Sequence, residues 1–304
     1  MQPFKKILLT GVNGQVGHAF VNAFQPLLAK DADLQLFALN REQLDLSNQD
    51  AIRRVVREIK PDLIINPAAY TMVDKAESES ELAFAINATA PQTLAVEAAK
   101  LNAKIVHYST DYVYDGTKAE AYNETDVTNP ISVYGKSKLA GEQAIQAVDA
   151  DYLIFRTSWV YGTYGKNFLN TILRLSRERE SLSIVADQFG APTSSISIAN
   201  ATLEVLNSIA QNQAQSQQGI YHLTNTGKTS WHGFATQIVA EYLANPINQD
   251  LVVSLIKPIT TAEYPTPAAR PANSLLNPKK LNATFNVSLP TWQQALKTAL
   301  NTQV

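Results

Sequence analysis

The sequence predicts an α/β protein with a doubly wound parallel sheet and a smaller C-terminal domain. Short β-branched runs alternate with longer helical stretches through the first half of the chain, which is typical of βαβ units around a parallel sheet. A glycine-rich loop separates the first of these runs from the first helical stretch. The length of 304 residues corresponds to about two domains.

The first half alternates strand and helix in a regular order. We expect strands at 6–10, 34–39, 63–66, 104–109 and 152–156. We expect helices at 15–28, 48–60, 80–102 and 133–147. Ser47 and Asp50 are spaced for a capping box at the start of the second helix, Pro61 ends that helix, and Pro91 is expected to divide the third. Right-handed crossovers then place these strands in one sheet.

After Trp159 the strands become short and scattered, while helical patterns continue. These patterns occupy 167–179, 197–209, 230–244 and 291–301, and the proline-rich stretch 258–278 resembles a long ordered loop. The change of rhythm predicts that the second half folds mainly as a separate domain.

The loop Gly11-Val-Asn-Gly-Gln-Val-Gly17 joins the first strand to the first helix. Glycines at this place let backbone amides at a helix N-terminus approach the pyrophosphate of a dinucleotide. The expected cofactor contacts are Gly11, Asn13, Gly14, Gln15, Val16 and Gly17. Residues 1–155 are therefore expected to form a dinucleotide-binding domain of the Rossmann type, rejoined by about 180–215 and the C-terminal helix. Residues 156–304 are expected to be mainly substrate-binding.

The end of the second strand favours NADPH as the cofactor. An acid there would bind the adenosine ribose and repel a 2′-phosphate, but the strand ends in Leu39-Asn40-Arg41. The Arg41 guanidinium can pair with a phosphate in fork geometry. Asp45 and Leu46 are expected to flank the adenine, and Glu42 keeps NADH possible.

Tyr134 and Lys138 lie one helical turn apart at the start of a helix, so their side chains share a face. A lysine ammonium and an oxidised nicotinamide close by would stabilise a phenolate and lower the pKa of the tyrosine from about 10. This brings the pKa closer to the pH where general acid catalysis is efficient. Thr110 follows the strand 104–109 and can hydrogen-bond the same substrate oxygen. These three residues predict carbonyl reduction or alcohol oxidation.

Composition excludes several other classes of protein. A net charge of −2 gives no global basic field to hold nucleic acid, and no apolar run approaches the ~20 residues of a membrane span. The chain has no cysteine, which removes disulfides and thiolate metal sites and is compatible with a reducing cytoplasm.

These motifs together resemble the extended short-chain dehydrogenase/reductases and, within them, the dTDP-4-dehydrorhamnose reductase family. The resemblance runs nearly end to end and is carried by residues 11–17, 66–77, 107–114, 129–142, 155–161, 187–193 and 264–271. It implies NADPH-dependent reduction of the C4 carbonyl of dTDP-4-dehydro-L-rhamnose to give dTDP-L-rhamnose. Thr110, Tyr134 and Lys138 are implied to be the catalytic triad, with Tyr134 as proton donor.

The resemblance also implies residues beside the two ligands. Along the cofactor these are Ala68, Ala69 and Tyr70, with Tyr134 and Lys138. Thr71, Val73, Tyr112 and Trp159 are implied to border the sugar ring, and Asn167, Gln188 and Arg270 the nucleotide-diphosphate end.

One departure from the family bears on metal binding and assembly. Some members bind Mg²⁺ at a dimer contact through two glutamates, where this chain has Ala19 and Ile196. Neither side chain has the oxygen donors that Mg²⁺ needs. We therefore expect no metal site of this type, and a monomer or weak homodimer.

Two alternatives remain open from the sequence. One is a non-catalytic NADP-binding regulatory subunit, which would bind the cofactor and a partner protein without turnover. The other is a different nucleotide-sugar reductase, epimerase or dehydratase on the same fold. A dehydratase is disfavoured, because its acid–base pair after the strand-end threonine is reduced here to Asp111.

Overall fold

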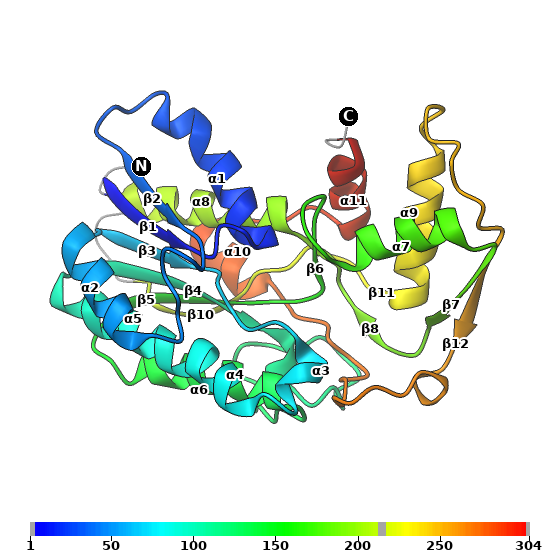
Figure 1. Cartoon of the computed structure of the whole chain (residues 1–304), viewed down its shortest axis with the longest axis horizontal. Coiled ribbons are helices and arrows are strands. Elements are labelled where there is room, and N and C mark those ends of the chain that lie inside the picture. Colours follow the sequence, from blue (N-terminus) through cyan, green and yellow to red (C-terminus); the bar gives the residue numbers. More distant parts are fainter. Residues whose placement is uncertain (1–3, 212–216, 302–304) are drawn as a thin grey trace.

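Six parallel strands form the central sheet in the computed structural model, which describes residues 4–211 and 217–301 (Figure 1). The strands are β1 (Lys6–Thr10), β2 (Gln35–Leu39), β3 (Leu63–Asn66), β4 (Lys104–Thr110), β5 (Asp151–Thr157) and β10 (Gly219–His222). Their order is β10-β5-β4-β3-β1-β2, and every neighbouring pair is parallel. The predicted fold class is confirmed, and each predicted strand of the first half lies within one residue of its observed bounds.

Helices cover both faces of the sheet, as a buried parallel sheet requires. One face carries α1 (Gln15–Leu28), α8 (Ser195–Gln211) and α10 (Lys279–Phe285), and the other carries α2 (Gln49–Ile59), α5 (Ala90–Lys100) and α6 (Val133–Gln146). All residues of β3 and β4 are buried. Leu9 faces a core shared with α1 and α8, and Leu8 faces one shared with α2 and α5.

Two local predictions in the first half need correction. Asn48, rather than Ser47, caps α2, because its side chain accepts a hydrogen bond from the Ala51 amide at 3.0 Å. Pro91 does not break the helix, which runs from α4 (Ser80–Phe84) through a π-helical turn (Ala85–Thr89) into α5. Pro91 lies at the start of α5, directly after the π-helical turn.

The second group of elements has its own apolar core. It contains α7 (Phe168–Glu178), α9 (Trp231–Leu243) and α11 (Trp292–Asn301), with the paired short strands β6 (Val160–Tyr161) and β9 (Thr193–Ser194), β7 (Ser181–Val185) and β12 (Leu255–Ile259), and β8 (Phe189–Gly190) and β11 (Thr229–Ser230). The stretch predicted as a loop at 258–278 thus begins with the end of β12 and a 3₁₀ turn, Thr261–Glu263.

The chain crosses between the sheet and this second group more than once. After β6, α7 and β7, the chain returns to the sheet with α8, which packs on α1, and with β10. The C-terminal helix does not rejoin the sheet as expected, because Trp292 and Leu296 pack with Phe234 of α9. We propose that 4–157, 195–223 and 279–285 form the dinucleotide-binding domain and that the remaining described residues form the substrate-binding domain. Among the described helices, none combines the length and the apolar character needed to cross a lipid bilayer.

Candidate active site

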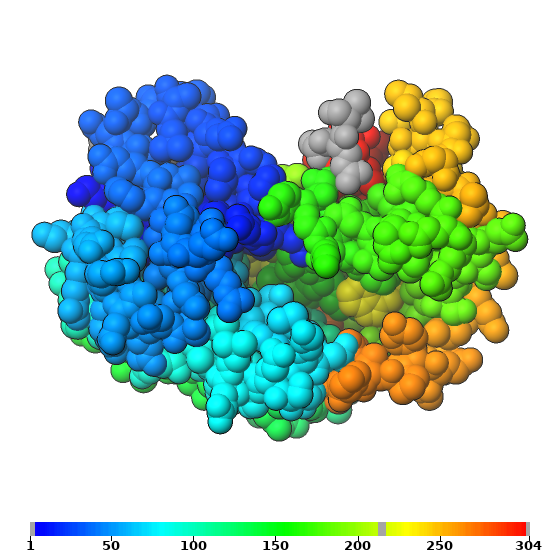
Figure 2. Space-filling model, viewed as in Figure 1, coloured from blue at the N-terminus to red at the C-terminus, as the bar shows by residue number. Residues whose placement is uncertain are grey.

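The candidate site lies where the carboxyl ends of the parallel strands meet the second group of elements. The sheet order changes direction at β1, which has β2 on one side and β3 on the other. In doubly wound sheets, ligands bind outside the carboxyl ends at such a switch point. Figure 2 shows a hollow here, between the blue and cyan N-terminal segments and the green and orange C-terminal segments.

The glycine loop is packed so closely that it admits no larger side chains at two positions. Gly11 has φ +62°, and a Cβ there would lie 2.7 Å from the Cβ of Ala68. A Cβ on Gly17 would collide with the Gly11 carbonyl. Gly14 begins α1 without a side-chain cap, so the first amides of the helix are left to bind an anion. The predicted cofactor loop therefore has the geometry of a phosphate cradle, with Asn13 exposed and Gln15 and Val16 half-buried.

The end of β2 lies beside this loop, since the Val12 amide donates to the Leu39 carbonyl at 3.4 Å. Asn40 accepts from the amides of Glu42 and Gln43 and so fixes the turn. Arg41 is exposed and makes no ion pair within the described part of the chain. Hydrogen bonds from Ser47 lower the pKa of Asp45, and Leu46 is buried at 6% exposure.

The segment after β3 is held by a residue that the sequence did not single out. Asn87, in the π-helical turn, accepts from the Tyr70 amide at 2.8 Å and donates to the Tyr70 carbonyl at 3.0 Å. It also donates to Ser137 on α6 at 3.0 Å. Asn87 thus fixes Tyr70, and with it Ala68 and Ala69, against the helix of Tyr134. A π-helical turn often marks a functional site, but no sequence pattern predicts one.

Tyr134 and Thr110 come together as predicted from the sequence. Tyr134 lies in the first turn of α6, which Ser132 caps by accepting from the Gly135 amide. Its ring meets that of Tyr112 edge to face, with centroids 5.5 Å apart. Burial raises the pKa of Tyr134 to about 12, with hydrogen bonding to Thr110 acting in the opposite direction. The phenol therefore stays protonated at neutral pH and can donate a proton.

Lys138 is buried one turn further along α6, with 1% of the residue exposed. Its ammonium donates to the Tyr108 carbonyl at 2.6 Å and lies 3.3 Å from Nε2 of His107. Burial lowers the pKa of Lys138 to about 8. The lowering of the Tyr134 pKa by Lys138 and an oxidised nicotinamide stays a prediction.

Asp111 is a buried acid next to the candidate proton donor. Its Oδ1 accepts from the Thr110 hydroxyl at 2.9 Å, and the residue is only 2% exposed. Burial raises the pKa of Asp111 to about 6, against hydrogen bonds from Ser274 and Thr110. Because a folded-state pKa above the unfolded value favours protonation, the native state loses stability as pH rises from 3.8 to about 6.

Replacing Asp111 with asparagine should therefore stabilise the fold at pH 8. We expect a gain of up to about 3 kcal/mol there, since each pKa unit corresponds to about 1.4 kcal/mol, and no gain below pH 4. Chemical denaturation of Asp111→Asn and the parent protein at pH 4 and pH 8 measures both values. An equal difference at the two pH values would contradict the buried-acid account.

Thr71 and Val73, two predicted sugar contacts, lie beside Asp74, which forms an ion pair with Arg270 of the C-terminal segment. Arg270 donates to Asp74 at 2.9 Å, and the Asp74 carboxylate also accepts from the Ala268 amide at 3.2 Å. Thr71 is exposed and Val73 half-buried at the start of α3 (Val73–Ala76). This ion pair holds the segment after β3 against the C-terminal segment that carries Arg270.

Trp159 reaches the second group of elements in a strained conformation. Its φ of +47° is rare for a large side chain and is retained only where surrounding contacts enforce it. The Trp159 ring stacks on Trp231 with centroids 3.6 Å apart and planes 6° apart. Sequence reasoning missed Trp231, because a lone tryptophan at the start of a helix has no distinguishing pattern.

Gln188 and Asn167 serve internal hydrogen bonds. Gln188 accepts from the indole of Trp231 at 3.2 Å and donates to Thr261 at 3.1 Å. Asn167 caps α7 by accepting from the Asn170 amide at 3.0 Å. Their predicted contacts with the nucleotide diphosphate stay predictions.

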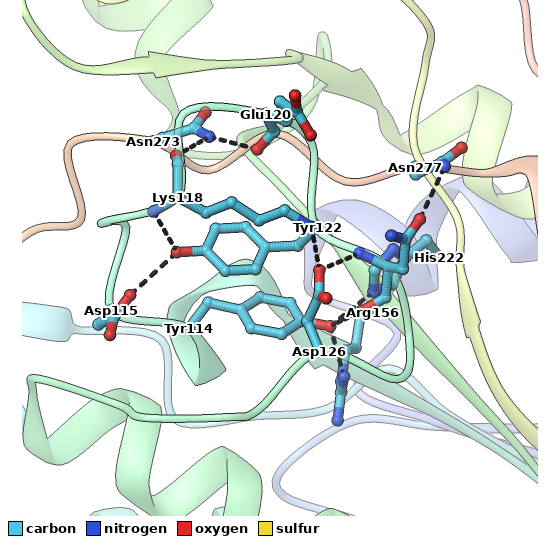
Figure 3. Close-up of polar contacts among 11 residues, drawn as sticks. Tyr114, Asp115, Lys118, Glu120, Tyr122, Asp126, Arg156, His222, Asn273 and Asn277 are labelled. Atoms are coloured by element: carbon cyan, nitrogen blue, oxygen red, sulfur yellow. Dashed lines mark hydrogen bonds and ion pairs between the residues drawn. The ribbon is translucent and has the colours of Figure 1, made fainter.

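A polar network anchors the loop that follows Thr110 (Figure 3). Arg156 on β5 donates to Tyr114 at 2.6 Å and is ion-paired with Glu142 of α6, both side chains being at most 3% exposed. Asn273 donates to the carbonyls of Lys118 and Glu120. The network ties the loop to α6, the sheet and the C-terminal segment.

No metal centre appears within residues 4–211 and 217–301, where no three acidic or histidine side chains are grouped to hold an ion. Ala19 is 8% exposed in the core and Ile196 is half-buried in α8. The absence of the magnesium site remains a prediction.

The sheet order, the glycine loop and the Tyr134–Lys138 helix define a nucleotide-binding oxidoreductase fold of the short-chain dehydrogenase/reductase class. The family model described as "RmlD substrate binding domain" matches residues 5–304. The chain belongs to this family of dTDP-4-dehydrorhamnose reductases, and it is accordingly an oxidoreductase.

Relatives of known name match the chain over nearly its whole length. It is 47% identical over 293 residues to dTDP-4-dehydrorhamnose reductase of Burkholderia thailandensis, covering 96% of each chain. It is 43% identical over 297 residues to dTDP-4-dehydrorhamnose reductase of Salmonella typhimurium, covering 97% of this chain and 96% of that one. The crystal structure of dTDP-4-dehydrorhamnose reductase from Bacillus anthracis, solved in complex with NADP, superposes with a TM-score of 0.86 at 36% identity, covering 98% of this chain and 99% of that one.

Proposed function

We propose that this protein reduces the C4 carbonyl of dTDP-4-dehydro-L-rhamnose, giving dTDP-L-rhamnose, and uses NADPH as the reductant. The observation that carries the proposal is a protonated tyrosine, Tyr134, beside Thr110 at the sheet edge that also holds the glycine loop. Full-length similarity to proteins named dTDP-4-dehydrorhamnose reductase supports the choice of substrate.

The residues at this edge fit NADPH. Gly11 and Gly17 leave backbone where side chains would collide, so a pyrophosphate can lie against the uncapped start of α1. Arg41 offers an exposed guanidinium for a 2′-phosphate, and the small side chains of Ala68 and Ala69 allow close approach after β3. When bound here, NADPH supplies a hydride to the carbonyl carbon.

Side chains of the protein then stabilise the negative charge that develops on the carbonyl oxygen. Tyr134 donates its proton to this oxygen, because its raised pKa keeps the phenol protonated before reaction. Thr110 holds the same oxygen by a hydrogen bond and so fixes its orientation. The Lys138 ammonium, buried one turn away, favours the phenolate that remains after proton transfer.

The sugar nucleotide is proposed to lie between Tyr112, Trp159 and the segment of Thr71 and Val73. The stacked indoles of Trp159 and Trp231 provide aromatic surface that suits the C–H groups of a deoxyhexulose. The guanidinium of Arg270 provides positive charge for the diphosphate, with Asp74 fixing its direction. We further propose that the protein works in the cytoplasm as a monomer or weak homodimer.

The test is reductase turnover with the proposed substrate. Purified protein is supplied with dTDP-4-dehydrorhamnose and NADPH, and loss of nicotinamide absorbance is followed together with formation of dTDP-L-rhamnose. We expect oxidation in proportion to product. Tight NADPH binding without oxidation would favour the alternative, a non-catalytic NADP-binding subunit, and would contradict the proposal.

Removing the Arg41 side chain should weaken the preference for NADPH over NADH. We expect Arg41→Ala to raise the KM for NADPH about 10- to 100-fold, the usual effect of losing a charged hydrogen bond, with little change for NADH. Arg179→Ala, an exposed arginine after α7, is the matched control. Equal KM changes for both cofactors would contradict the assignment of Arg41 to the 2′-phosphate.

A further inference from the structure

A chain of buried polar side chains runs beneath the candidate active site, from α6 to the end of β1. Nζ of Lys138 lies 3.3 Å from Nε2 of His107, and Nδ1 of His107 lies 3.1 Å from the amide of Asn66. As the amide is placed in the structure, its oxygen accepts from Oγ1 of Thr10 at 2.6 Å and its nitrogen faces His107. Thr10 is the residue before the glycine loop. All four residues are at most 1% exposed.

Within the described part of the chain, no carboxylate forms an ion pair with Lys138. Glu142, one turn further along α6, is paired with Arg156 on β5, and its charge acts on Lys138 from beyond hydrogen-bond distance, where it raises the pKa of the lysine. The acceptors that face Lys138 within hydrogen-bond distance are therefore neutral: the Tyr108 carbonyl and the imidazole of His107. Since burial disfavours the charged form of a lysine, each of these acceptors bears directly on whether Lys138 stays charged.

His107 is itself held neutral, because burial and the charge of Lys138 keep its pKa well below the usual range. A neutral imidazole carries one proton, so one nitrogen donates and the other accepts. An ammonium has only donors. Nε2 of His107 can therefore bind charged Lys138 only when the imidazole proton is on Nδ1.

The Asn66 amide determines whether that tautomer is available. When Asn66 Nδ2 faces His107, Nδ1 must accept, and the imidazole proton on Nε2 points at Lys138; this suits only an uncharged amine. When the amide is turned over, its oxygen accepts from Nδ1–H and its nitrogen donates to Thr10. Both orientations occupy the same heavy-atom positions, but only the second satisfies a charged lysine.

We propose that His107 is a positioning residue for Lys138: with its proton on Nδ1 and fixed by the oxygen of Asn66, it accepts a hydrogen bond from the Lys138 ammonium at Nε2. The catalytic use of this ammonium rests on the proposed function. Through Thr10, the arrangement also joins the lysine to the strand end that carries the glycine loop.

The tautomer can be measured directly, without turnover. In protein labelled with ¹⁵N at histidine, the ring nitrogens of His107 are assigned by comparison with His107→Gln. At pH 6.5, where Lys138 is charged, we expect a protonated Nδ1 and an unprotonated Nε2. A protonated Nε2 at this pH would overturn the proposal and leave the proposed reductase activity untouched.

Variants test what this acceptor does for the reaction. His107→Phe should lower kcat about 10- to 100-fold, the effect of one charged hydrogen bond. It should also move the alkaline limb of the pH profile of kcat, where Lys138 loses its proton, to lower pH. His107→Gln, which offers an amide oxygen as acceptor, should restore most of kcat and the position of the limb. Unchanged kcat and limb in His107→Phe would overturn the proposal.

A second buried histidine provides the matched control. His222 on β10 is 0% exposed and bonds Tyr114 rather than Lys138. We expect His222→Gln to lower thermal stability while leaving the alkaline limb in place. If both histidine variants lost stability alike and neither moved the limb, His107 would be only a packing residue and the proposal would be wrong. A parent protein that binds NADPH but never oxidises it would instead refute the proposed function.

Discussion

Replacing Tyr134 with phenylalanine should lower reductase turnover by about 10²- to 10⁴-fold, the usual contribution of a general acid. The substitution removes only the hydroxyl, so the edge-to-face contact with Tyr112 remains and the fold should be kept. NADPH affinity should change little, because the phosphate cradle of the glycine loop is untouched. Stopped-flow turnover measures the first effect, and titration of cofactor fluorescence measures the second.

The matched control for this prediction is Tyr152→Phe at the amino end of β5. That tyrosine is half-buried, like Tyr134, but lies at the opposite edge of the sheet from the candidate site, so turnover should stay near that of the parent. Comparable turnover in Tyr134→Phe and Tyr152→Phe would count against the tyrosine as proton donor. Loss of NADPH binding in Tyr134→Phe would indicate a structural role instead.

Replacing Glu142 with glutamine should produce the largest loss of stability. Glu142 accepts from Nε and Nη2 of Arg156, with no measurable exposure of its own side chain. Removing one partner leaves a buried guanidinium uncompensated, which costs about 3–5 kcal/mol. Because Arg156 also holds Tyr114 in the network of Figure 3, the loop after Thr110 should loosen as well. Urea denaturation measures the change in free energy of unfolding.

An exposed ion pair serves as the comparison for Glu142. Arg174 and Glu178 are paired one turn apart on α7, with side chains 59% and 49% exposed, and such pairs contribute about 0.5 kcal/mol. Glu178→Gln should therefore be nearly neutral. A loss in Glu142→Gln no larger than in Glu178→Gln would refute the stabilising role of the buried pair.

The sheet could be predicted because its strands have two buried faces. In β3 (Leu63–Asn66), three consecutive apolar residues, Leu63–Ile65, lie between two prolines. A run this short with flanking prolines favours a buried strand over a helix. The glycine loop was equally readable, since strand, loop and helix follow in order. Helix caps were harder to predict. Ser47 and Asn48 are both residue types that cap helices well, and the structure shows that Asn48 is the one used.

The site was predicted where neighbours in sequence are neighbours in space. Tyr134 and Lys138 share a helix, and Thr110 ends the strand beside it. Asn87 and Trp231 were missed because their contacts join segments far apart in the chain, to Tyr70 in one case and Trp159 in the other. The effect of burial on the Tyr134 pKa was missed for the same reason. The spacing to Lys138 was visible, but burial by several distant segments was not.

Contacts between segments far apart in the chain also explain why the domain of the C-terminal helix was predicted incorrectly. The return of α8 and β10 to the sheet can be suspected from apolar helical and strand patterns. The packing of the C-terminal helix could not be predicted, because an amphipathic helix fits either core equally well. Trp292 decides it by packing with Phe234 of α9 rather than with α1.

The most direct measurement follows the hydrogen that is transferred. Protein, dTDP-4-dehydrorhamnose and NADPH deuterated at the transferable C4 position are incubated in ordinary water, and the sugar product is analysed by NMR. Direct reduction of the carbonyl predicts one deuterium at sugar C4 for each NADPH consumed, and a hydroxyl proton that comes from water. A product without deuterium at C4, or deuterium at another sugar carbon, would contradict the account.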